Sequence, residues 1–445
     1  MTQQCDVLVI GGGPAGSTIS HLLADKGHKV VLLEKDHHPR FHIGESLLPM
    51  NMPILEKLGL LDEVLKMGVK KNGADFTSPE DESATCAFYF EKAMDKTNPS
   101  ALQVRRAEFD LLLLERSKAK GTDVREGIKV TDVTFRKGKK TLVSALDENQ
   151  NDLTWEAGFV VDASGRETFL SGKFKFKEKN PHHQSAAIFG HFKNVERRKT
   201  EKDEGNISIY WFDSGWVWVI PLPDGNMSVG AVCWPEYLKS RNKPLEEFLR
   251  DTFKRSPTLN KRMLNAELVN EVRATGNFAY TSKKMYGDGY MMVGDAYTFL
   301  DPVFSAGVYM AMSSANTGAK IVDTYLRNPR EGLIQAEAME REINKGLKVI
   351  SWFIYRFTSP VMRKMFLRPD KTGVIESAVI SVLAGDFFGG SRIGRGIFVF
   401  KFWYYFLYLM DFPAQWKSFL LRKRNVHEIF DQGTTPQDNP EVMAG

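Results

Sequence analysis

The sequence predicts an α/β fold of three parts: a βαβ domain, an inserted and mainly antiparallel β-sheet domain, and a helical C-terminal region. The chain opens with a short apolar strand, "CDVLVI", followed by a glycine-rich turn and a helical pattern. Residues 185–235 group several β-like runs, which is typical of an antiparallel sheet. After residue 331 the pattern is mostly helical. These three observations together favour the α/β class.

The composition is that of an ordinary globular protein. The chain has 445 residues, 42% of them hydrophobic and 26% charged, so two or three domains are expected. A net charge of +5 does not indicate a nucleic-acid partner. Cys5, Cys86 and Cys233 lie too far apart to suggest a disulfide framework, and "MTQQCDVLVIGGG" has no basic segment before its apolar run. We therefore expect no signal peptide and a cytoplasmic location.

The elements of the first half follow in order. Residues 5–10 form the first predicted strand, "PAGSTISHLLADKG" forms a helix that ends at Gly27, and "KVVLLEK" forms the second strand. Helical patterns cover residues 51–70 and 104–121. Polar, alternating segments at 122–160 lead to "GFVVDASGR", a strand that runs into a tight turn.

The second half begins with the β-like runs "SAAIFGHF", "ISIYWF", "WVWVIPL" and "MSVGAVCW", and returns to strand, turn and helix over 290–325. An apolar stretch at 396–412 is interrupted by Lys401 and is short for a span of roughly 20 apolar residues. We expect a C-terminal helix that is buried or lies on the protein surface, in preference to membrane contact. The polar tail at 431–445 is expected to be mobile.

A dinucleotide site is predicted in the first βαβ unit. In "GGGPAG", Gly11 permits a tight turn, Gly13 lets backbone approach a pyrophosphate, and Gly16 lets the helix pack on the strand. The N-terminus of the helix then faces the phosphates with unpaired N–H groups. Glu34 ends the second strand, at the expected position of a ribose-binding acid. This unit alone does not decide between NAD and FAD.

A second segment, "MMVGDA" followed by "FLDPVFSAGVYMA", favours a flavin. Asp295 stands at the C-terminal end of a strand, where a carboxylate accepts hydrogen bonds from a polyol such as ribityl. The helix that opens at "SAGVYMA" directs its N–H groups toward the flavin edge that becomes negative on reduction. A turn-capping Asp is the structural alternative for Asp295.

The chain resembles the flavin-dependent halogenases, within the class A flavin monooxygenase superfamily. The resemblance covers residues 5–325 and rests on "GGGPAG", Glu34, "RFHIGESLLP", "VRRAEFD", "DASGR" and "VGDA". Two further motifs are typical of halogenases: "GWVWVIP", which supplies Trp216, Trp218 and Ile220, and "FLDPVFSAG", which supplies Phe299, Pro302, Ser305 and Gly307. The family's lysine precedes a glycine by two positions, as Lys71 does in "GVKKNGADF".

The resemblance implies a chemistry and assigns residues to it. Reduced FAD and O2 form a flavin C4a-hydroperoxide, a bound chloride or bromide attacks it, and hypohalous acid results. Backbone N–H groups of Ala306 and Gly307 would hold the halide, and Ser305 would orient a partner by a hydrogen bond. Lys71 would act as an ammonium that donates to hypohalous acid, or as a neutral amine that forms a haloamine. The implied catalytic residues are therefore Lys71 and Ser305.

The remaining assignments concern the cofactor and the passage to the substrate. Trp216 and Trp218, with Ile220 and Phe299, would separate substrate from flavin by their bulk, although core packing is an equally good reading of the tryptophans. Glu45 and Arg106 also have readings without a functional role: Glu45 as a carboxylate that caps a helix, and Arg106 as an exposed surface arginine. The full cofactor-binding set is predicted to be Gly11, Gly13, Pro14, Ala15, Gly16, Glu34, Lys35, Arg40, Glu45, Ser46, Arg106, Asp295, Pro302, Gly307 and Val308. No His or Cys cluster has metal-ligand spacing, so no metal is expected.

These motifs predict where the three domains of the chain begin and end. The FAD-binding domain is expected at 1–75, 101–170 and 271–330, the substrate domain at 76–100 and 171–270, and the helical region at 331–445.

The resemblance also implies partners. A separate flavin reductase would supply the reduced FAD, and the substrate would be a phenol or pyrrole, free or tethered to an acyl or peptidyl carrier protein. Basic residues of the C-terminal region would attract an acidic carrier; they are Arg392, Arg395, Lys401, Lys417, Arg422, Lys423 and Arg424. A solvated charged face is the alternative reading of these residues. An aromatic hydroxylase, a geranylgeranyl-reductase-like enzyme and a flavin-binding module without turnover are the alternative functions.

Overall fold

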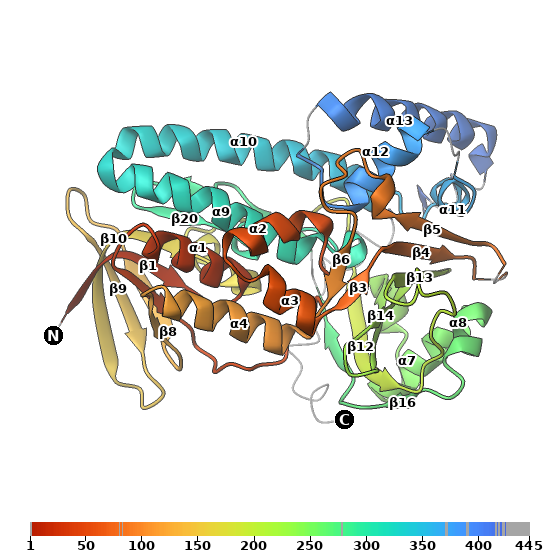
Figure 1. Cartoon of the computed structure of the whole chain (residues 1–445), viewed down its shortest axis with the longest axis horizontal. Coiled ribbons are helices and arrows are strands. Elements are labelled where there is room, and N and C mark those ends of the chain that lie inside the picture. Colours follow the sequence, from red (N-terminus) through yellow and green to blue (C-terminus); the bar gives the residue numbers. More distant parts are fainter. Residues whose placement is uncertain are drawn as a thin grey trace.

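The structure of the chain is a computed structural model. This structure describes residues 2–79, 81, 83–276, 279–369, 373–388, 391–413, 416, 419–420 and 423. Two large sheets lie at opposite ends of the molecule, and helices cover them along one side (Figure 1). The α/β class predicted from the sequence, with its inserted antiparallel sheet and helical C-terminal region, is confirmed. The predicted tail at 431–445 lies outside the described residues.

The first sheet contains the predicted βαβ unit. Its strand order is β19-β20-β10-β1-β2-β7, and β10, β1, β2 and β7 run parallel. The strands are β1 (Gln3–Ile10), β2 (Val30–Leu33), β7 (Asp123–Arg125), β10 (Asp152–Asp162), β19 (Tyr286–Gly287) and β20 (Tyr290–Met292). Strands β8 (Lys129–Thr134) and β9 (Thr141–Leu146) extend β10 as an antiparallel meander. Because the second half of β1 (residues 7–10) and all of β2 are covered on both faces, their sequences there are continuous apolar runs.

Helices α1 (Pro14–Ala24), α4 (Arg106–Ala119) and α9 (Ala306–Arg327) pack side by side on this sheet (Figure 1). The helix predicted over 51–70 is two helices, α2 (Met52–Lys57) and α3 (Leu61–Met67), preceded by η1 (Pro49–Asn51). Gly59 ends α2 in the left-handed region, with φ +66°. The short elements η3 (Gly165–Glu167), α5 (Phe169–Lys173), η4 (Gly294–Ala296) and η5 (Pro302–Phe304) lie beyond strand ends.

The second sheet is mainly antiparallel, with the order β16-β12-β15-β14-β13-β4-β5 and with β17 paired to β12. Its strands are β4 (Gly73–Thr77), β5 (Thr85–Tyr89), β12 (Ala186–Lys193), β13 (Ile207–Phe212), β14 (Gly215–Pro221), β15 (Met227–Cys233), β16 (Glu267–Leu268) and β17 (Arg273–Thr275). Helices α7 (Leu245–Lys254) and α8 (Pro257–Arg262) bury one face of it, and α6 (Pro235–Lys239) follows β15. The predicted domain limits after 75 and after 270 therefore fall inside β4 and just before β17.

Small sheets connect the two halves. Strand β3 (Val69–Lys71) pairs with β6 (Ala101–Gln103), and η2 (Phe90–Lys92) follows β5. Strands β11 (Lys177–Lys179), β18 (Tyr280–Ser282) and β21 (Thr298–Phe299) form a three-stranded sheet. The pairing of β3 with β6 places Lys71 in the seam between the two large sheets.

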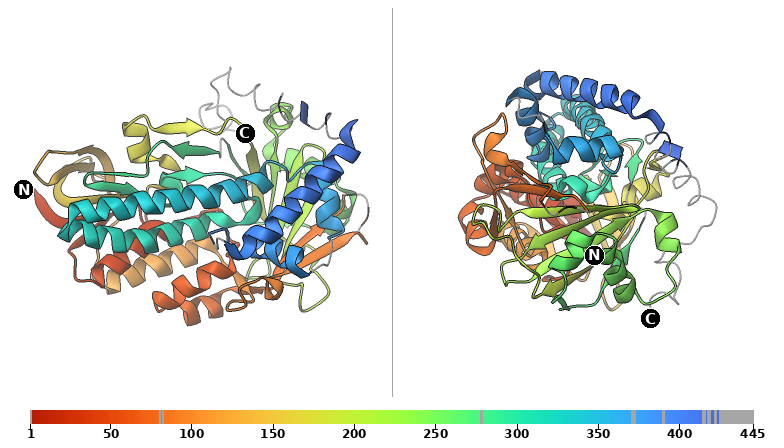
Figure 2. Two further views of the ribbon diagram at one scale, coloured as in Figure 1. Left: turned by 90° about the horizontal axis from the view of Figure 1, so that it is seen from above. Right: turned by 90° about the vertical axis from the view of Figure 1, so that its right-hand side faces the viewer.

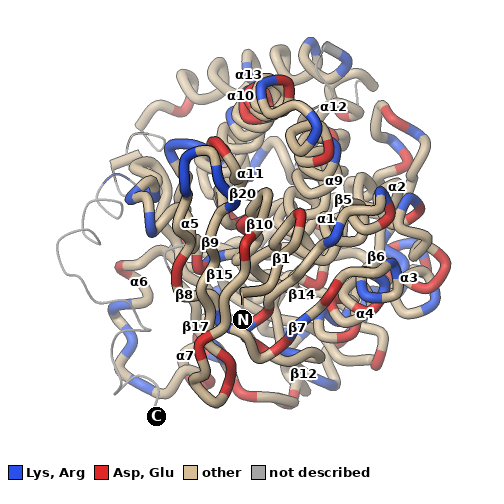
Figure 3. The backbone as a smooth tube through the Cα atoms, turned by 90° about the vertical axis from the view of Figure 1, so that its left-hand side faces the viewer, with Lys and Arg blue, Asp and Glu red and all other residues tan. Residues whose placement is uncertain are grey.

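The C-terminal region is helical, as predicted. It comprises α10 (Pro329–Ile354), α11 (Pro360–Leu367), α12 (Gly373–Leu383) and α13 (Ser391–Met410), and α13 lies at the outside of the molecule (Figure 2). The stretch at 396–412 forms most of α13, a helix at the protein surface as expected. Within the described part of the chain, none of the helices combines the length and apolar character that crossing a bilayer requires. Basic and acidic residues are interspersed over the face shown in Figure 3.

Candidate active site

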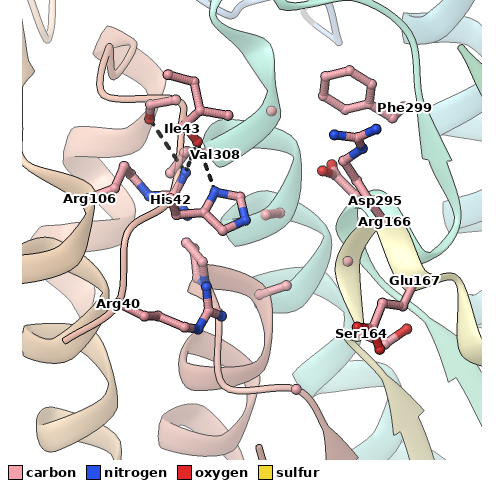
Figure 4. Close-up of a pocket in the computed structure, with 18 of the residues that line it drawn as sticks. Arg40, His42, Ile43, Arg106, Ser164, Arg166, Glu167, Asp295, Phe299 and Val308 are labelled. Atoms are coloured by element: carbon pink, nitrogen blue, oxygen red, sulfur yellow. Dashed lines mark hydrogen bonds between the residues drawn. The ribbon is translucent and has the colours of Figure 1, made fainter. Parts of the chain in front are cut away.

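A cavity of about 730 Å³ lies where the first sheet, the loop 34–46, strand β14 and the start of α9 meet (Figure 4). This volume is within the range of cofactor sites. Most of the residues predicted from the sequence line it. They are Gly11, Gly13, Pro14, Ala15, Glu34, Lys35, Arg40, Glu45, Ser46, Arg106, Trp216, Trp218, Ile220, Asp295, Phe299, Pro302, Ser305, Gly307 and Val308. Gly16, Lys71 and Ala306 do not line the cavity.

The three motif glycines have different surroundings. A Cβ on Gly11, whose φ is +101°, would lie 2.5 Å from the carbonyl oxygen of Ala163. A Cβ on Gly16 would lie 1.9 Å from the carbonyl oxygen of Gly11, so these two glycines allow helix α1 to pack on β1. A Cβ on Gly13 would meet no protein atom within 4 Å. Gly13 therefore leaves room in the cavity itself, before the N-terminus of α1, where a pyrophosphate fits.

Glu34 is held at the edge of the cavity and is nearly fully buried. Its Oε2 accepts a hydrogen bond from the N–H of Gly12 at 2.6 Å, and its Oε1 accepts one from the N–H of Asp36 at 3.0 Å. A guanidinium nitrogen of Arg40 lies 3.5 Å from Oε2. The carboxylate is thereby oriented at the end of β2, where it can accept from ribose hydroxyls. Lys35 is turned toward the surface and pairs with Glu167.

Asp295 faces the cavity from η4, opposite Arg166 (Figure 4). Burial raises the pKa of its carboxyl to about 6, against the opposing charges of Arg166 and Arg106. Within the described residues, its side-chain oxygens accept no protein hydrogen bond. A half-buried carboxyl that faces a cavity can accept from hydroxyl donors of a bound molecule, which fits the ribityl chain of FAD.

The loop at 36–46 is fixed to helix α4 and to the second sheet. Arg106 donates to both carboxylate oxygens of Asp110 at 2.8 Å, and to the carbonyl oxygen of Ile43 at 2.8 Å. Its guanidinium thus anchors the loop while it lines the cavity. Glu45 accepts from the N–H of Gly44 and lies 3.0 Å from Nε2 of His191, which belongs to β12. Glu45 therefore connects the loop to the substrate-domain sheet.

Sequence reasoning assigned no role to four residues around the cavity: Phe41, Arg166 and Arg273, which line it, and His191, which does not. Phe41 stacks on Phe189 with ring centroids 6.2 Å apart, and the guanidinium of Arg273 lies 4.2 Å from the Phe41 ring centroid. Arg166 donates to Thr275 and to the carbonyl oxygen of Gly276. Arg166 stands within the quoted motif "DASGR" and Phe41 within "RFHIGESLLP", whereas His191 and Arg273 carry no signal beyond their residue types.

The start of α9 is shaped by the turn at 301–305. The Asp301 carboxylate accepts from the N–H of Val303 at 3.0 Å and from Ser185 Oγ at 3.1 Å, and lies 2.6 Å from His183 Nε2. Ser305 adopts the left-handed region, with φ +54°, and its side chain makes no capping hydrogen bond. A Cβ on Gly307 would meet only the Phe299 ring, at 3.6 Å. The N-terminal end of α9, with its first N–H groups and the positive end of the helix dipole, therefore faces the cavity.

Trp216 and Trp218 alternate on β14 and project to the same face, with ring centroids 6.0 Å apart. The Trp218 indole N–H donates to Ser228 Oγ at 3.1 Å. A Cβ on Gly230 would lie 2.3 Å from the Trp218 ring, so a glycine on β15 provides the space for that ring. On its other side Trp216 meets Phe357 of the C-terminal region, at 6.0 Å between centroids. The two indoles form a wall between the cavity and the aromatic core beyond it.

Lys71 is buried, with 1% of its surface exposed. Its ammonium donates to Ser46 Oγ at 2.9 Å and to the carbonyl oxygen of Leu47 at 3.0 Å, and lies 5.1 Å from the Phe90 ring centroid. Among the described residues no carboxylate pairs with this ammonium, and burial lowers the pKa of Lys71 to about 7. Because Ser46 also lines the cavity, one side chain separates the Lys71 amine from it.

Lys71 should make the stability of the fold depend on pH. Its pKa lies below the ordinary value of 10.5, so between about pH 7 and pH 10 the unfolded chain binds more protons than the folded one. The free energy of unfolding should therefore rise with pH, by about 2 kcal/mol between pH 7 and pH 9. Urea unfolding at both pH values should show this difference in the wild type and a smaller one in Lys71→Met. Lys70→Met, at the exposed neighbouring position, should keep the wild-type difference.

Comparison with known proteins gives consistent results. A family model described as "FAD binding domain" matches residues 4–344. The 1H-pyrrole-2-carbonyl-(peptidyl-carrier protein) chlorinase of Pseudomonas fluorescens is 29% identical over 409 residues, which cover 87% of this chain and 90% of that protein. The corresponding brominase of Pseudoalteromonas luteoviolacea is 31% identical over 358 residues, covering 79% and 81%. The structure of the myxobacterial chondrochloren halogenase, an FAD-dependent halogenase, matches with a TM-score of 0.74 at 32% identity, covering 86% and 90%.

Proposed function

The chain belongs to the flavin-dependent halogenases and is an enzyme of that type, and from this premise we propose that it halogenates an electron-rich aromatic ring through Lys71. The observation that carries the proposal is the environment of that lysine. Its buried amine lies behind Ser46, which lines the cavity together with Trp216 and Trp218, and its pKa of about 7 leaves both protonation states populated near neutral pH.

The residues around the cavity fit FAD. Gly13 and the N-terminus of α1 would receive the pyrophosphate, Glu34 the adenosine ribose, and Asp295 the ribityl hydroxyls. When bound in reduced form, FAD supplies with O2 the oxidant that turns halide into hypohalous acid. A separate flavin reductase would provide the reduced form, and a cytoplasmic location suits the three cysteines, which are free in the structure.

The start of α9 would bind the halide. Backbone N–H groups at Ala306 and Gly307 are free of side-chain caps, and the helix dipole favours an anion there. Gly307 lines the cavity, whereas the Ala306 side chain is buried away from it, so Ala306 would act through its backbone alone. Ser305 would orient water, lysine or substrate by a hydrogen bond from its hydroxyl, which makes no capping bond.

If the two indoles separate the substrate from FAD, Lys71 would be the group that passes the oxidised halogen to the substrate. Trp216 and Trp218 would keep the aromatic substrate away from FAD, so oxygen is not transferred directly to the ring. As an ammonium, Lys71 would donate a hydrogen bond to hypohalous acid and make the halogen more electrophilic. As a neutral amine, it would react with hypohalous acid to give a haloamine and water, and the haloamine would then pass the halogen to the ring while a ring proton is lost.

The relatives support a pyrrole substrate carried by a protein. Two of them act on pyrrole-2-carbonyl held by a peptidyl carrier protein, and both match most of this chain. We propose a pyrrole or phenol, tethered as an acyl thioester in preference to the free acid. Arg392, Arg395 and Lys401 would help to attract an acidic carrier. Lys417, Arg422 and Arg424 lie outside the described residues.

A coupled assay tests this function. The enzyme is supplied with FAD, NADH, a flavin reductase, bromide and pyrrole-2-carbonyl on a carrier protein, and the product is identified by mass spectrometry. We expect a brominated acyl carrier and much slower bromination of free pyrrole-2-carboxylic acid. Hydroxylated product or no product would contradict a halogenase function, and equal turnover of the two substrates would contradict carrier tethering alone.

A further inference from the structure

Helix α13 exposes an apolar side from Phe398 to its end at Met410. One stripe of the helix is buried against the rest of the chain through Ile393, Ile397, Phe400 and Tyr404. The opposite side is apolar and open: Phe398 is 72% exposed, Leu409 71% and Met410 74%. Other exposed apolar side chains of α13 are Val399, Phe402, Trp403, Tyr405, Phe406 and Leu407. The tube of α13 is tan along most of its length in Figure 3.

The apolar side continues past the end of α13. Phe412, Trp416, Phe419 and Leu420 are exposed, and most of the large exposed apolar side chains among the described residues lie between 398 and 420. From Phe398 to Met410 the exposed run covers roughly 20 Å of helix, and a contiguous apolar patch of this kind, unlike single exposed apolar residues, marks an interaction surface. The surface is therefore expected to be covered when the protein functions.

The charged residues within this segment of the sequence are nearly all basic. Between residues 391 and 424 the sequence contains one acid, Asp411, which pairs with Lys364 at 3.1 Å. The basic residues of the same segment are Arg392, Arg395, Lys401, Lys417, Arg422, Lys423 and Arg424. Arg392 and Arg395 are exposed on the first turns of α13, and Lys423 follows the apolar segment. Exposed aromatic and aliphatic side chains with basic residues at both ends are the features of helices that lie in an anionic bilayer surface.

Charge also distinguishes a bilayer from a second copy of the chain. In a two-fold pair of α13 helices, the same basic segment of each copy would face the other, which opposes association. A bilayer with anionic headgroups instead neutralises these charges and accepts the whole apolar side at once.

We propose that α13, with Phe412, Trp416, Phe419 and Leu420, docks this protein on an anionic lipid surface, with the helix axis parallel to the membrane. The parallel orientation follows from packing, because the buried stripe holds α13 on α10: Phe400 lies 5.4 Å from Phe353 and Tyr404 lies 5.2 Å from Trp352, centroid to centroid. The sequence favoured a buried or surface helix over membrane contact. The apolar side chains that α13 exposes favour a surface helix that also contacts a membrane. The inference does not depend on the halogenase function.

Vesicle sedimentation with the full chain tests the docking. We expect the protein to sediment with vesicles of phosphatidylcholine containing one-third phosphatidylglycerol, and much less with phosphatidylcholine alone. Leu409→Ser and Phe402→Ser should each lower the partition coefficient by up to roughly tenfold. Leu264→Ser is the matched control, because Leu264 is also 71% exposed but lies elsewhere on the surface. Circular dichroism and FAD content should be unchanged in all three variants.

Two results would overturn the proposal. One is sedimentation that does not depend on phosphatidylglycerol or survives both α13 substitutions. The other is a dimer, seen by light scattering after gel filtration, that Leu409→Ser dissociates while vesicles do not bind; a second copy would then cover the surface.

Discussion

Lys71→Met is expected to abolish carbon–halogen bond formation, with a loss of roughly 10³-fold or more in turnover. The substitution removes the amine that would receive the oxidised halogen but keeps a flexible side chain of similar length in the buried site. Since Lys71 does not line the cavity, FAD binding should change little, and NADH oxidation should continue with release of hydrogen peroxide. Brominated product by mass spectrometry and peroxide by a dye assay measure the two outcomes together.

Lys70→Met is the control for this experiment. Lys70 precedes Lys71 in the same strand but is exposed, so its replacement should leave bromination at the wild-type rate. Retained bromination in Lys71→Met would show that the halogen reaches the ring without this amine. Loss of FAD binding in Lys71→Met would show that the lysine acts by supporting Ser46 and the cavity wall.

The parts of the site that the sequence predicted depend on short-range patterns. The glycines of "GGGPAG" and Glu34 lie within one βαβ unit, where the turn, the strand and the helix N-terminus have a fixed relation. Lys71 is different, because Lys70 beside it has the same chemistry. Only the resemblance to halogenases distinguished the two, and the structure then separates them by burial.

The parts that the sequence did not predict depend on contacts across the fold. Glu45 meets His191 across 146 positions, and Arg273 reaches Phe41 from a strand of the other large sheet. No local periodicity contains such pairs, since they form only when the two sheets pack around the cavity. The sequence could not predict which side of α13 is exposed, for a similar reason. Its sequence is apolar all round, and only the packed structure shows which stripe the protein covers.

Gly13→Val should weaken FAD binding without weakening the fold. The backbone of Gly13 is extended, with φ −73° and ψ −173°, a conformation that valine adopts readily, and a Cβ there meets no protein atom within 4 Å. The new side chain would occupy the space before α1 where the pyrophosphate fits. We expect the Kd for FAD, measured by fluorescence titration, to rise by about tenfold to hundredfold.

Gly172→Val is the matched control, because a Cβ on Gly172 also meets no protein atom but does not face the cavity. It should leave the Kd for FAD unchanged. Urea unfolding of both proteins without FAD should stay within about 0.5 kcal/mol of the wild type. An unchanged Kd in Gly13→Val would mean that the pyrophosphate does not approach this glycine. The assignment of the GGGPAG turn as its binding site would then be wrong, even though the strand and helix around it fold as the motif requires.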